Sequence, residues 1–247
     1  MAIGGKKIMK FYVLTLFPEM IDSFVSHSII GRAKEKSIID IKCVNIRDFS
    51  YNKHNKVDDY PYGGGAGMVM QAPPIYKAYE SLNKDKSVRV IFVTPSGKTF
   101  NQEMVKELSK EQELIILCGH YEGVDQRVID EIVTDEISIG DYVLTGGELP
   151  ACVMIDAVSR LTPGVLNKDE SFENESFENN LLEYPQYTRP KVFMGREVPE
   201  VLISGHHENV AKWRLGKAIE KTAKVRPDLM SLPPSPPAPL PQRERGE

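Results

Sequence analysis

The sequence has 247 residues, of which 41% are hydrophobic and 27% are charged, and its formal net charge is −4. This balance predicts a soluble globular protein with one large domain and one small one, and the net acidity alone gives no sign of a nucleic-acid partner. Three widely spaced cysteines, Cys43, Cys118 and Cys152, argue against a disulfide framework or a CxxC zinc site and fit a reducing cytoplasm. No apolar run is long enough for a membrane span or a signal segment, so we expect a cytoplasmic protein without a membrane partner.

Predicted strands and helices alternate along the first two thirds of the chain. Apolar runs rich in β-forming residues predict strands over residues 10–16, 38–46, 88–93, 113–118 and 132–139. Helical periodicity predicts helices from residue 18 to about 34 and over residues 73–82, 101–110 and 149–161. Such alternation predicts an α/β fold with a mostly parallel sheet that is covered on both faces.

Glycines stand where several of these strands must stop and turn. Gly119, Gly140 and the pair Gly146–Gly147 all do so, and glycine lets backbone amides approach a ligand closely. The chain lacks both GxGxxG and GxxxxGK[ST], and no lysine follows Gly63–Gly67 in the way that a phosphate-binding loop requires. The glycine turns therefore predict a small-molecule site without a phosphate cradle, although tight turns alone would also demand glycine.

The net charge of the last third of the chain changes from negative to positive along its length. Residues 167–188 hold six acidic residues against one lysine, include the repeat ESFEN at 170–174 and 175–179, and predict a mobile linker. Residues 189–226 hold nine Lys and Arg against four Glu, a balance of 9 − 4 = +5, with helical periodicity over 209–224. This stretch predicts an anion-binding helix, although a solvated helix face would look the same. The proline-rich segment 231–247 is expected to be disordered.

Several sequence blocks resemble one enzyme family. CGHYEGVDQRV at 118–128 and ISIGDYVLTGGELP at 137–150 are followed by YPQYTRP at 184–190 and SGHHENVAKWR at 204–214. Together with blocks at 14–20, 47–70, 94–97 and 156–166, they are similar, in the same order, to the bacterial tRNA (guanine-N1)-methyltransferases, the TrmD family of the SPOUT class.

The resemblance implies a fold that the residue patterns alone do not predict. It implies a trefoil knot where residues 117–161 pass through an earlier loop, against the general rule that chains do not thread. The implied organisation is a knotted methyltransferase domain at 1–166, the acidic linker at 167–188, a small α-helical tRNA-binding domain at 189–230 and the tail at 231–247. The tail departs from the family, whose members usually continue as helix here, so one interpretation is that the C-terminal domain is incomplete.

The resemblance also implies a methyl donor, S-adenosyl-L-methionine, and a site for it. An adenine ring favours backbone amides and carbonyls within apolar walls, which the glycine turns can supply. The partners implied are tRNA and a second copy of the chain, in a homodimer whose active sites lie at the subunit interface, and Mg²⁺ would assist, although no carboxylate set for it is identifiable. The implied cofactor-binding residues are Thr94, Pro95, Gly119, Tyr121, Glu122, Ile139, Gly140, Asp141, Tyr142, Val143, Leu144, Gly146, Gly147 and Pro150.

Catalysis at N1 of guanine needs a base for the N1 proton and a donor to O6. The resemblance gives Arg160 the second role, while an ion pair with the acidic linker is the alternative for this arginine. By register the base is Glu175, where most family members have aspartate, and Asp169 beside the other ESFEN copy competes with it. Tyr121 could instead be a core residue, and Glu122 or Asp141 could instead cap a helix.

Two other functions compete with this interpretation, which places the methyl group on the tRNA guanosine at position 37, directly 3′ of the anticodon. One is a different SPOUT RNA methyltransferase, against which YPQYTRP and VSR argue, and the other is an RNA-binding member that has lost turnover. The adjacent histidines His206 and His207, followed by Glu208, could suggest a metal site, but no third ligand stands at a matching spacing. We therefore expect the start of a helix there and no metal site.

Overall fold

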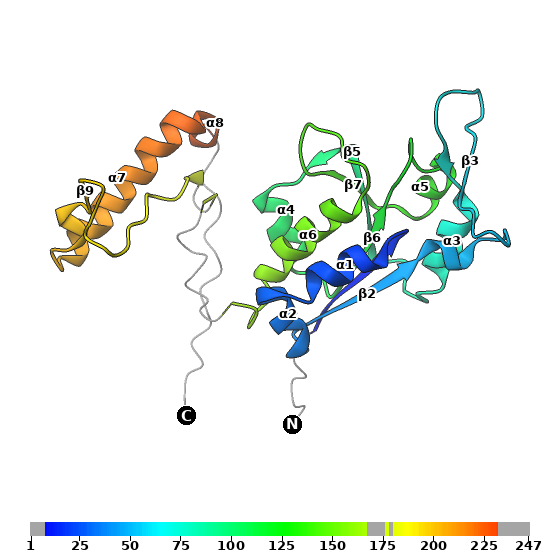
Figure 1. The fold of residues 1–247 in the computed structure, drawn as a ribbon, viewed down its shortest axis with the longest axis horizontal. Helices are drawn as coiled ribbons and strands as arrows, with labels where there is room; N and C mark the ends of the chain where they lie inside the picture. The colour runs from blue at the N-terminus through cyan, green and yellow to red at the C-terminus, as the bar shows by residue number, and fades with distance from the viewer. Residues whose placement is uncertain (1–7, 167–175, 178–179, 232–247) are drawn as a thin grey trace. The chain divides into compact units, whose positions relative to one another are not determined.

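A computed structural model describes residues 8–166, 176–177 and 180–231 of the protein (Figure 1). The chain divides into two compact units, with the boundary between Asn167 and Lys168. The first unit combines a five-stranded sheet with several helices, and the second contains a long helix and a short hairpin.

The sheet of the first unit is parallel throughout, as the sequence predicts. Its strand order is β2-β1-β6-β5-β7, and every neighbouring pair runs in the same direction. The carboxyl ends of the strands therefore share one edge of the sheet, the usual place for a ligand in an open α/β fold. The strands are β1 (Met9–Thr15), β2 (Ile39–Asn45), β5 (Arg89–Thr99), β6 (Glu113–Cys118) and β7 (Asp135–Ser138).

Helices pack against both faces of this sheet, also as predicted. One face is covered by α1 (Pro18–Val25), α2 (Ser28–Glu35), α4 (Gln102–Leu108) and α6 (Glu148–Arg160). The other is covered by the 3-10 helix η1 (Ile46–Phe49), α3 (Ala72–Glu80) and α5 (Gln126–Ile132). A separate antiparallel pair is formed by β3 (Asp58–Asp59) and β4 (Val69–Met70).

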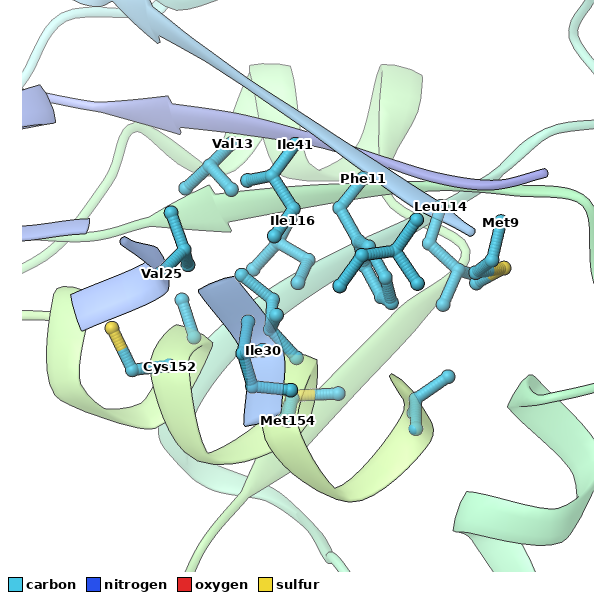
Figure 2. Packing of buried hydrophobic residues seen from close by; sticks show 14 of the residues in the cluster. Met9, Phe11, Val13, Val25, Ile30, Ile41, Leu114, Ile116, Cys152 and Met154 are labelled. Carbon is cyan, nitrogen blue, oxygen red and sulfur yellow. The ribbon is translucent and has the colours of Figure 1, made fainter. Parts of the chain in front are cut away.

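Alternation along the strands explains the two cores. Phe11 of β1 is buried in the cluster beneath α1, α2, α4 and α6, whereas its neighbour Tyr12 is buried in the cluster on the opposite face. Figure 2 shows Phe11 and Ile116 of the strands close to Ile30 of α2 and Met154 of α6. Burial of each such side chain stabilises the fold by about 1.5–3 kcal/mol. The two cores together therefore fix the sheet, whose carboxyl edge carries the loops after the strands.

The prediction of one helix over residues 18–34 is wrong. Two helices occur, because the chain turns between Val25 and Ser28, which has a positive φ of 58°. The turn packs so closely on α2 that a Cβ atom at Gly31 would lie 2.6 Å from the carbonyl oxygen of Ser26. Gly31 therefore permits the tight turn, although its place in the sequence suggests only an ordinary helix position.

The strands near the glycine turns also differ from their predicted limits. The apolar run at 132–139 begins with the last residue of α5, and only Asp135–Ser138 forms a strand. β5 continues past Val93 to Thr99, and its register shifts so that Val93 and Lys98 both face Ile137. The residues between them bulge outward, which brings Thr94 and Pro95 to the carboxyl edge of the sheet.

The second unit is organised around a long helix. It contains a two-stranded hairpin of β8 (Val192–Phe193) and β9 (Arg196–Glu197), the 3-10 helix η4 (Glu200–Leu202), α7 (His207–Val225) and α8 (Pro227–Met230). The helix predicted over 209–224 is confirmed by α7. Ala218 and Thr222 are its buried residues, while Leu215 is exposed. Half of the predicted acidic linker, residues 167–175, 178 and 179, and almost all of the tail lie outside the described residues.

Candidate active site

A cleft lies at the carboxyl ends of β5 and β7, beside the start of α6. Its walls include the apolar side chains of Val93 and Ile137, and Ser138 contributes a polar group. Nine of the fourteen residues expected to bind the cofactor line this one cleft. They are Thr94, Pro95, Ile139, Gly140, Tyr142, Leu144, Gly146, Gly147 and Pro150.

The other five expected residues, Gly119, Tyr121, Glu122, Asp141 and Val143, do not line the cleft. Tyr121 is 46% exposed, and its hydroxyl lies 3.5 Å from Nη2 of Arg47, so the alternative that it packs in the core is wrong. The alternative of a helix cap at Glu122 is also wrong, because Asp125 is the residue that caps α5. Asp141 and Val143 are exposed and lie in the loop that borders the cleft.

A tyrosine narrows the cleft. Gly140 has a positive φ of 152°, and a Cβ atom there would lie 2.5 Å from Cε1 of the Tyr142 ring. The Tyr142 hydroxyl donates to the carbonyl oxygen of Ile139 over 3.3 Å, which folds the side chain back over the turn. The cavity that remains is about 50 Å³, well below the roughly 300 Å³ at which ligand pockets begin. A ligand the size of a nucleoside therefore requires Tyr142 or its loop to move.

A buried carboxylate fixes the base of the same loop. Glu148, at the start of α6, is 2% exposed, and its two oxygens accept hydrogen bonds from Oγ1 of Thr15 at 2.5 Å and from Nε2 of His120 at 2.7 Å. Thr15 Oγ1 in turn accepts from the backbone N–H of Phe17 at 2.9 Å. This network joins the end of β1, the loop after β6 and the first turn of α6, and no motif in the sequence points to it.

The charge on Glu148 is stabilised by its partners. Burial by itself raises the pKa of this carboxyl, but the hydrogen bonds from His120 and Thr15 outweigh burial, so the pKa lies below its ordinary value. Glu148 is therefore ionised near neutral pH and acts as an acceptor. Its place at the N-terminus of α6 also favours a negative charge, because the first N–H groups of a helix point towards it.

The glycines beside this network allow unusually close packing. A Cβ atom at Gly146 would collide with the His120 ring, and one at Gly147 would lie 2.7 Å from Cα of Cys118. The backbone N–H of Gly147 donates to the carbonyl oxygen of Gly119 at 3.0 Å, which joins the two loops. Tight packing thus accounts for Gly146 and Gly147 without reference to a ligand.

The glycine-rich loop at 63–67 also packs against this region. A Cβ atom at Gly67 would collide with the side chain of Glu122, and the N–H of Glu122 donates to the carbonyl oxygen of Met68 at 3.0 Å. Gly63, Gly64 and Gly65 have positive φ values and open surroundings, apart from Pro61 beside Gly65. This loop therefore borders the segment that carries Tyr121 and Glu122.

Arg160, the one proposed catalytic residue that the structure describes, does not lie at the cleft of its own chain. Arg160 is the last residue of α6, whereas the cleft lies at the first turn of that helix. The 13 residues of α6 span about 18–20 Å at 1.5 Å per residue, so Arg160 is far from its own chain's cleft. Glu175 and Asp169 lie outside the described residues.

Other candidate chemistries find little support in this unit. All three cysteines are free, and burial raises the pKa of the Cys118 thiol well above its ordinary range, so it is a poor nucleophile beside the cleft. Within residues 8–166, 176–177 and 180–231, no group of three His, Cys, Asp or Glu side chains could hold a metal ion. The helices in those same ranges include none that is long and apolar enough to cross a membrane.

The histidine pair of the second unit begins a helix, as expected. α7 starts at His207 with His206 at the N-cap position, but the His206 side chain makes no capping hydrogen bond to the helix. Its Nδ1 atom instead lies 3.0 Å from the carbonyl oxygen of Ser204.

Comparison with known proteins decides the family. The family described as tRNA (Guanine-1)-methyltransferase TrmD matches residues 9–232. The chain belongs to this family. Proteins named tRNA (guanine-N(1)-)-methyltransferase include one from Alkaliphilus oremlandii, 61% identical over 88% of this chain and 90% of its own length. Another, from Clostridioides difficile, is 58% identical over 90% of this chain and 97% of its own length. The TrmD match ends at residue 232, so the proline-rich tail lies almost wholly beyond it.

Proposed function

We propose that the protein transfers a methyl group from S-adenosyl-L-methionine to N1 of guanosine 37 in tRNA. The main support is that nine residues of the TrmD-like blocks line one cleft at the carboxyl edge of a parallel sheet. Family membership supports the reaction type, and the relatives' names support tRNA guanine as the substrate.

The cleft suits the proposed methyl donor in kind. The apolar walls from Val93, Ile137 and Leu144 are suited to an adenine ring, and the glycine turns offer backbone N–H and C=O groups at short range. When bound, S-adenosyl-L-methionine would supply an electrophilic methyl group on sulfur. Opening of Tyr142 away from Gly140 would provide the missing volume, and Glu148 would keep the base of the loop in place meanwhile.

The proposed chemistry divides between two side chains. The carboxylate of Glu175 takes the N1 proton as the N1–methyl bond forms, and the carbon–sulfur bond breaks to release S-adenosylhomocysteine. The Arg160 guanidinium donates to O6, where negative charge develops as N1 loses its proton. Asp169 is the alternative base, because the ESFEN repeat offers two registers for the same function.

We propose that each active site combines two subunits. Arg160 lies at the opposite end of α6 from its own chain's cleft, so the arginine that acts there would come from another copy. An apolar patch supports this arrangement: Met20 and Phe24 of α1 are 44% and 41% exposed, and Leu149 and Val153 of α6 are 56% and 47% exposed. α1 and α6 pack against each other (Figure 1), so the four side chains lie on neighbouring helices. A patch of this kind favours a protein partner, and a twofold dimer would pair α6 with its copy.

The remaining parts of the proposal depend on the family alone. They are a trefoil knot at 117–161, a methyltransferase domain at 1–166, a tRNA-binding domain at 189–230 and a cytoplasmic location. Mg²⁺ has no support among the described residues, and no step above requires it.

The deciding experiment is methyl transfer from labelled donor to an unmodified tRNA transcript. We expect label on N1 of guanosine 37, and none on a transcript with adenosine at that position. Label on a ribose would favour a different SPOUT methyltransferase. Tight tRNA binding without transfer would favour a member that has lost turnover.

The choice of base has its own experiment. Glu175→Gln and Asp169→Asn each remove one carboxylate charge with little change in size, and single-turnover methylation compares them directly. We expect Glu175→Gln to abolish transfer and Asp169→Asn to have a small effect. Loss of transfer in Asp169→Asn alone would assign the base to Asp169, beside the other copy of the repeat.

A further inference from the structure

The second unit contains a pocket of its own, remote in sequence from the cleft. Its volume is about 360 Å³, within the range of small-molecule sites. One wall is the extended segment 184–189, and others come from η4 and from α7. Every lining residue falls between Tyr184 and Arg214, so the pocket is complete within this unit.

Aromatic side chains form much of the pocket. The rings of Tyr187 and Trp213 lie 6.2 Å apart between centroids and are tilted by 59°. Tyr187 is 47% exposed and Trp213 is partly buried, so this pair presents ring surface to solvent. The partly buried side chains of Val198 and Leu202 add apolar surface. The pocket therefore offers an apolar, aromatic surface to a flat ligand.

Cations surround this aromatic surface. Arg189, Lys191 and Arg214 line the pocket, and none of its lining residues is acidic. The Arg214 guanidinium lies over the Tyr184 ring, with Cζ 4.9 Å from the centroid, which keeps the cation at the pocket wall. A ligand that suits these walls has a flat aromatic part and at least one negative charge.

Hydrogen bonds hold the two residues that precede the extended segment, Leu182 and Glu183, next to α7. The N–H of Leu182 donates to Oγ1 of Thr222 at 2.8 Å, and Thr222 Oγ1 donates to the carbonyl oxygen of Ala218 at 2.7 Å. Lys221 Nζ donates to the carbonyl oxygen of Glu183 at 3.1 Å. The segment therefore enters the pocket wall from a fixed position, and the pocket is formed before a ligand binds.

We propose that this pocket takes one unpaired base of the tRNA anticodon loop. The base stacks on the Tyr187–Trp213 surface, and its flanking phosphates contact Arg189 and Lys191. Unpaired bases are the parts of RNA that proteins read by stacking on aromatic rings and arginine planes, whereas a paired stem exposes no ring face. That tRNA is the ligand rests on the proposed function. The pocket adds which part of the tRNA the second unit binds.

Trp213 makes the pocket directly observable, because it is the only tryptophan in the sequence. Titration of the full-length protein with an unmodified tRNA transcript should quench its fluorescence. Tyr187→Ala should weaken binding about ten- to a hundredfold, as expected when one stacking partner is lost. The matched control is Phe193→Ala, because Phe193 is a 66% exposed aromatic residue of the same unit outside the pocket, and its affinity should stay close to the parent's.

Abasic sites placed singly around the anticodon loop identify the base. At one position, loss of the base should weaken binding to the parent protein about as much as Tyr187→Ala weakens binding to the intact transcript. Combining that abasic site with Tyr187→Ala should cause little further loss of affinity, because both changes remove the same contact. Losses that combine independently at every position, or an equal loss in Phe193→Ala, would overturn the proposal. If Tyr187→Ala fails to fold, as judged by the helical circular dichroism, Tyr187→Leu keeps apolar volume without a ring and gives the same test.

Two further outcomes separate this inference from the proposed function. Quenching that depends on Tyr187 without methyl transfer would support the pocket while the proposed function fails. Normal methyl transfer with unchanged affinity in Tyr187→Ala would overturn the pocket and leave the function intact. Trp213 fluorescence that changes with protein concentration alone, with an altered oligomeric state in Tyr187→Ala, would show that a second copy of the chain occupies the pocket instead.

Discussion

Replacement of Glu148 by glutamine should destabilise the protein although the side chain keeps its shape. The carboxylate is 2% exposed and accepts from both Thr15 and His120. Glutamine retains one acceptor oxygen for Thr15, but it removes the charge and turns an N–H group towards the His120 ring. A hydrogen bond to a charged group contributes about 1.5–3 kcal/mol, so we expect a loss of about 2 kcal/mol in the free energy of unfolding.

Thermal unfolding followed by circular dichroism measures this loss. For a chain of this size, about 2 kcal/mol corresponds to a fall of about 4–8 °C in the midpoint. The matched control is Glu107→Gln, which also removes a carboxylate charge, here one paired with the Arg89 guanidinium at a side chain that is 60% exposed. An exposed pair contributes less than about 1 kcal/mol, so the control should shift the midpoint much less.

The pH dependence of the loss has a fixed sign. Because the pKa of Glu148 is lower in the folded protein than its ordinary value of 4.5, its charge contributes stability above that value. That contribution disappears as the pH falls through the folded-state pKa. The difference between parent and Glu148→Gln should therefore be full at pH 7 and shrink below about pH 4.5. Equal midpoints at pH 7, or a difference that stays constant into the acid range, would refute this account of the network.

Two further predictions concern the proposed reaction. Gly140→Val should weaken S-adenosyl-L-methionine binding in calorimetry, because valine is strained at a φ of 152° and its side chain would meet the Tyr142 ring; unchanged affinity in the folded variant would misplace the cofactor site. Arg160→Ala should slow single-turnover methyl transfer by on the order of a hundredfold while donor affinity changes little, because charge on O6 develops only towards the transition state. An unchanged rate would leave Arg160 as a partner in a surface ion pair.

Much of the fold follows from local patterns in the sequence. The strand Glu113–Cys118 has its predicted limits, and the helices after Gln71, Asn101 and Gly147 begin within one residue of their predicted starts. These elements are predictable because apolar periodicity and helix-start residues are local signals. The turn at Ser26–Ser28 is not, since it depends on close packing against Gly31, and the short apolar run at 132–139 reads equally well as helix end or strand.

The site was less predictable than the fold. Family blocks identify the nine residues that line the cleft, but no local pattern shows that Tyr142 folds over Gly140 or that Glu148 is buried. Both depend on contacts between segments that are distant in sequence, such as the pairing of Glu148 with Thr15 across 133 positions. The pocket around Trp213 is unpredictable for the same reason. Its aromatic residues belong to separate blocks, and the local sequence shows only the excess of Lys and Arg over Glu in residues 189–226.

The most direct test of the central claim is a pair of mixed dimers, purified by two different affinity tags. In the first, one subunit carries Gly140→Val and the other carries Arg160→Ala; in the second, one subunit carries both changes and the other is unchanged. A site that combines the cleft of one subunit with Arg160 of the other predicts about half of the parent's methyl transfer in the first dimer and almost none in the second. An inactive first dimer with a half-active second would place Arg160 and the cleft of the same chain in one site, and would contradict the account.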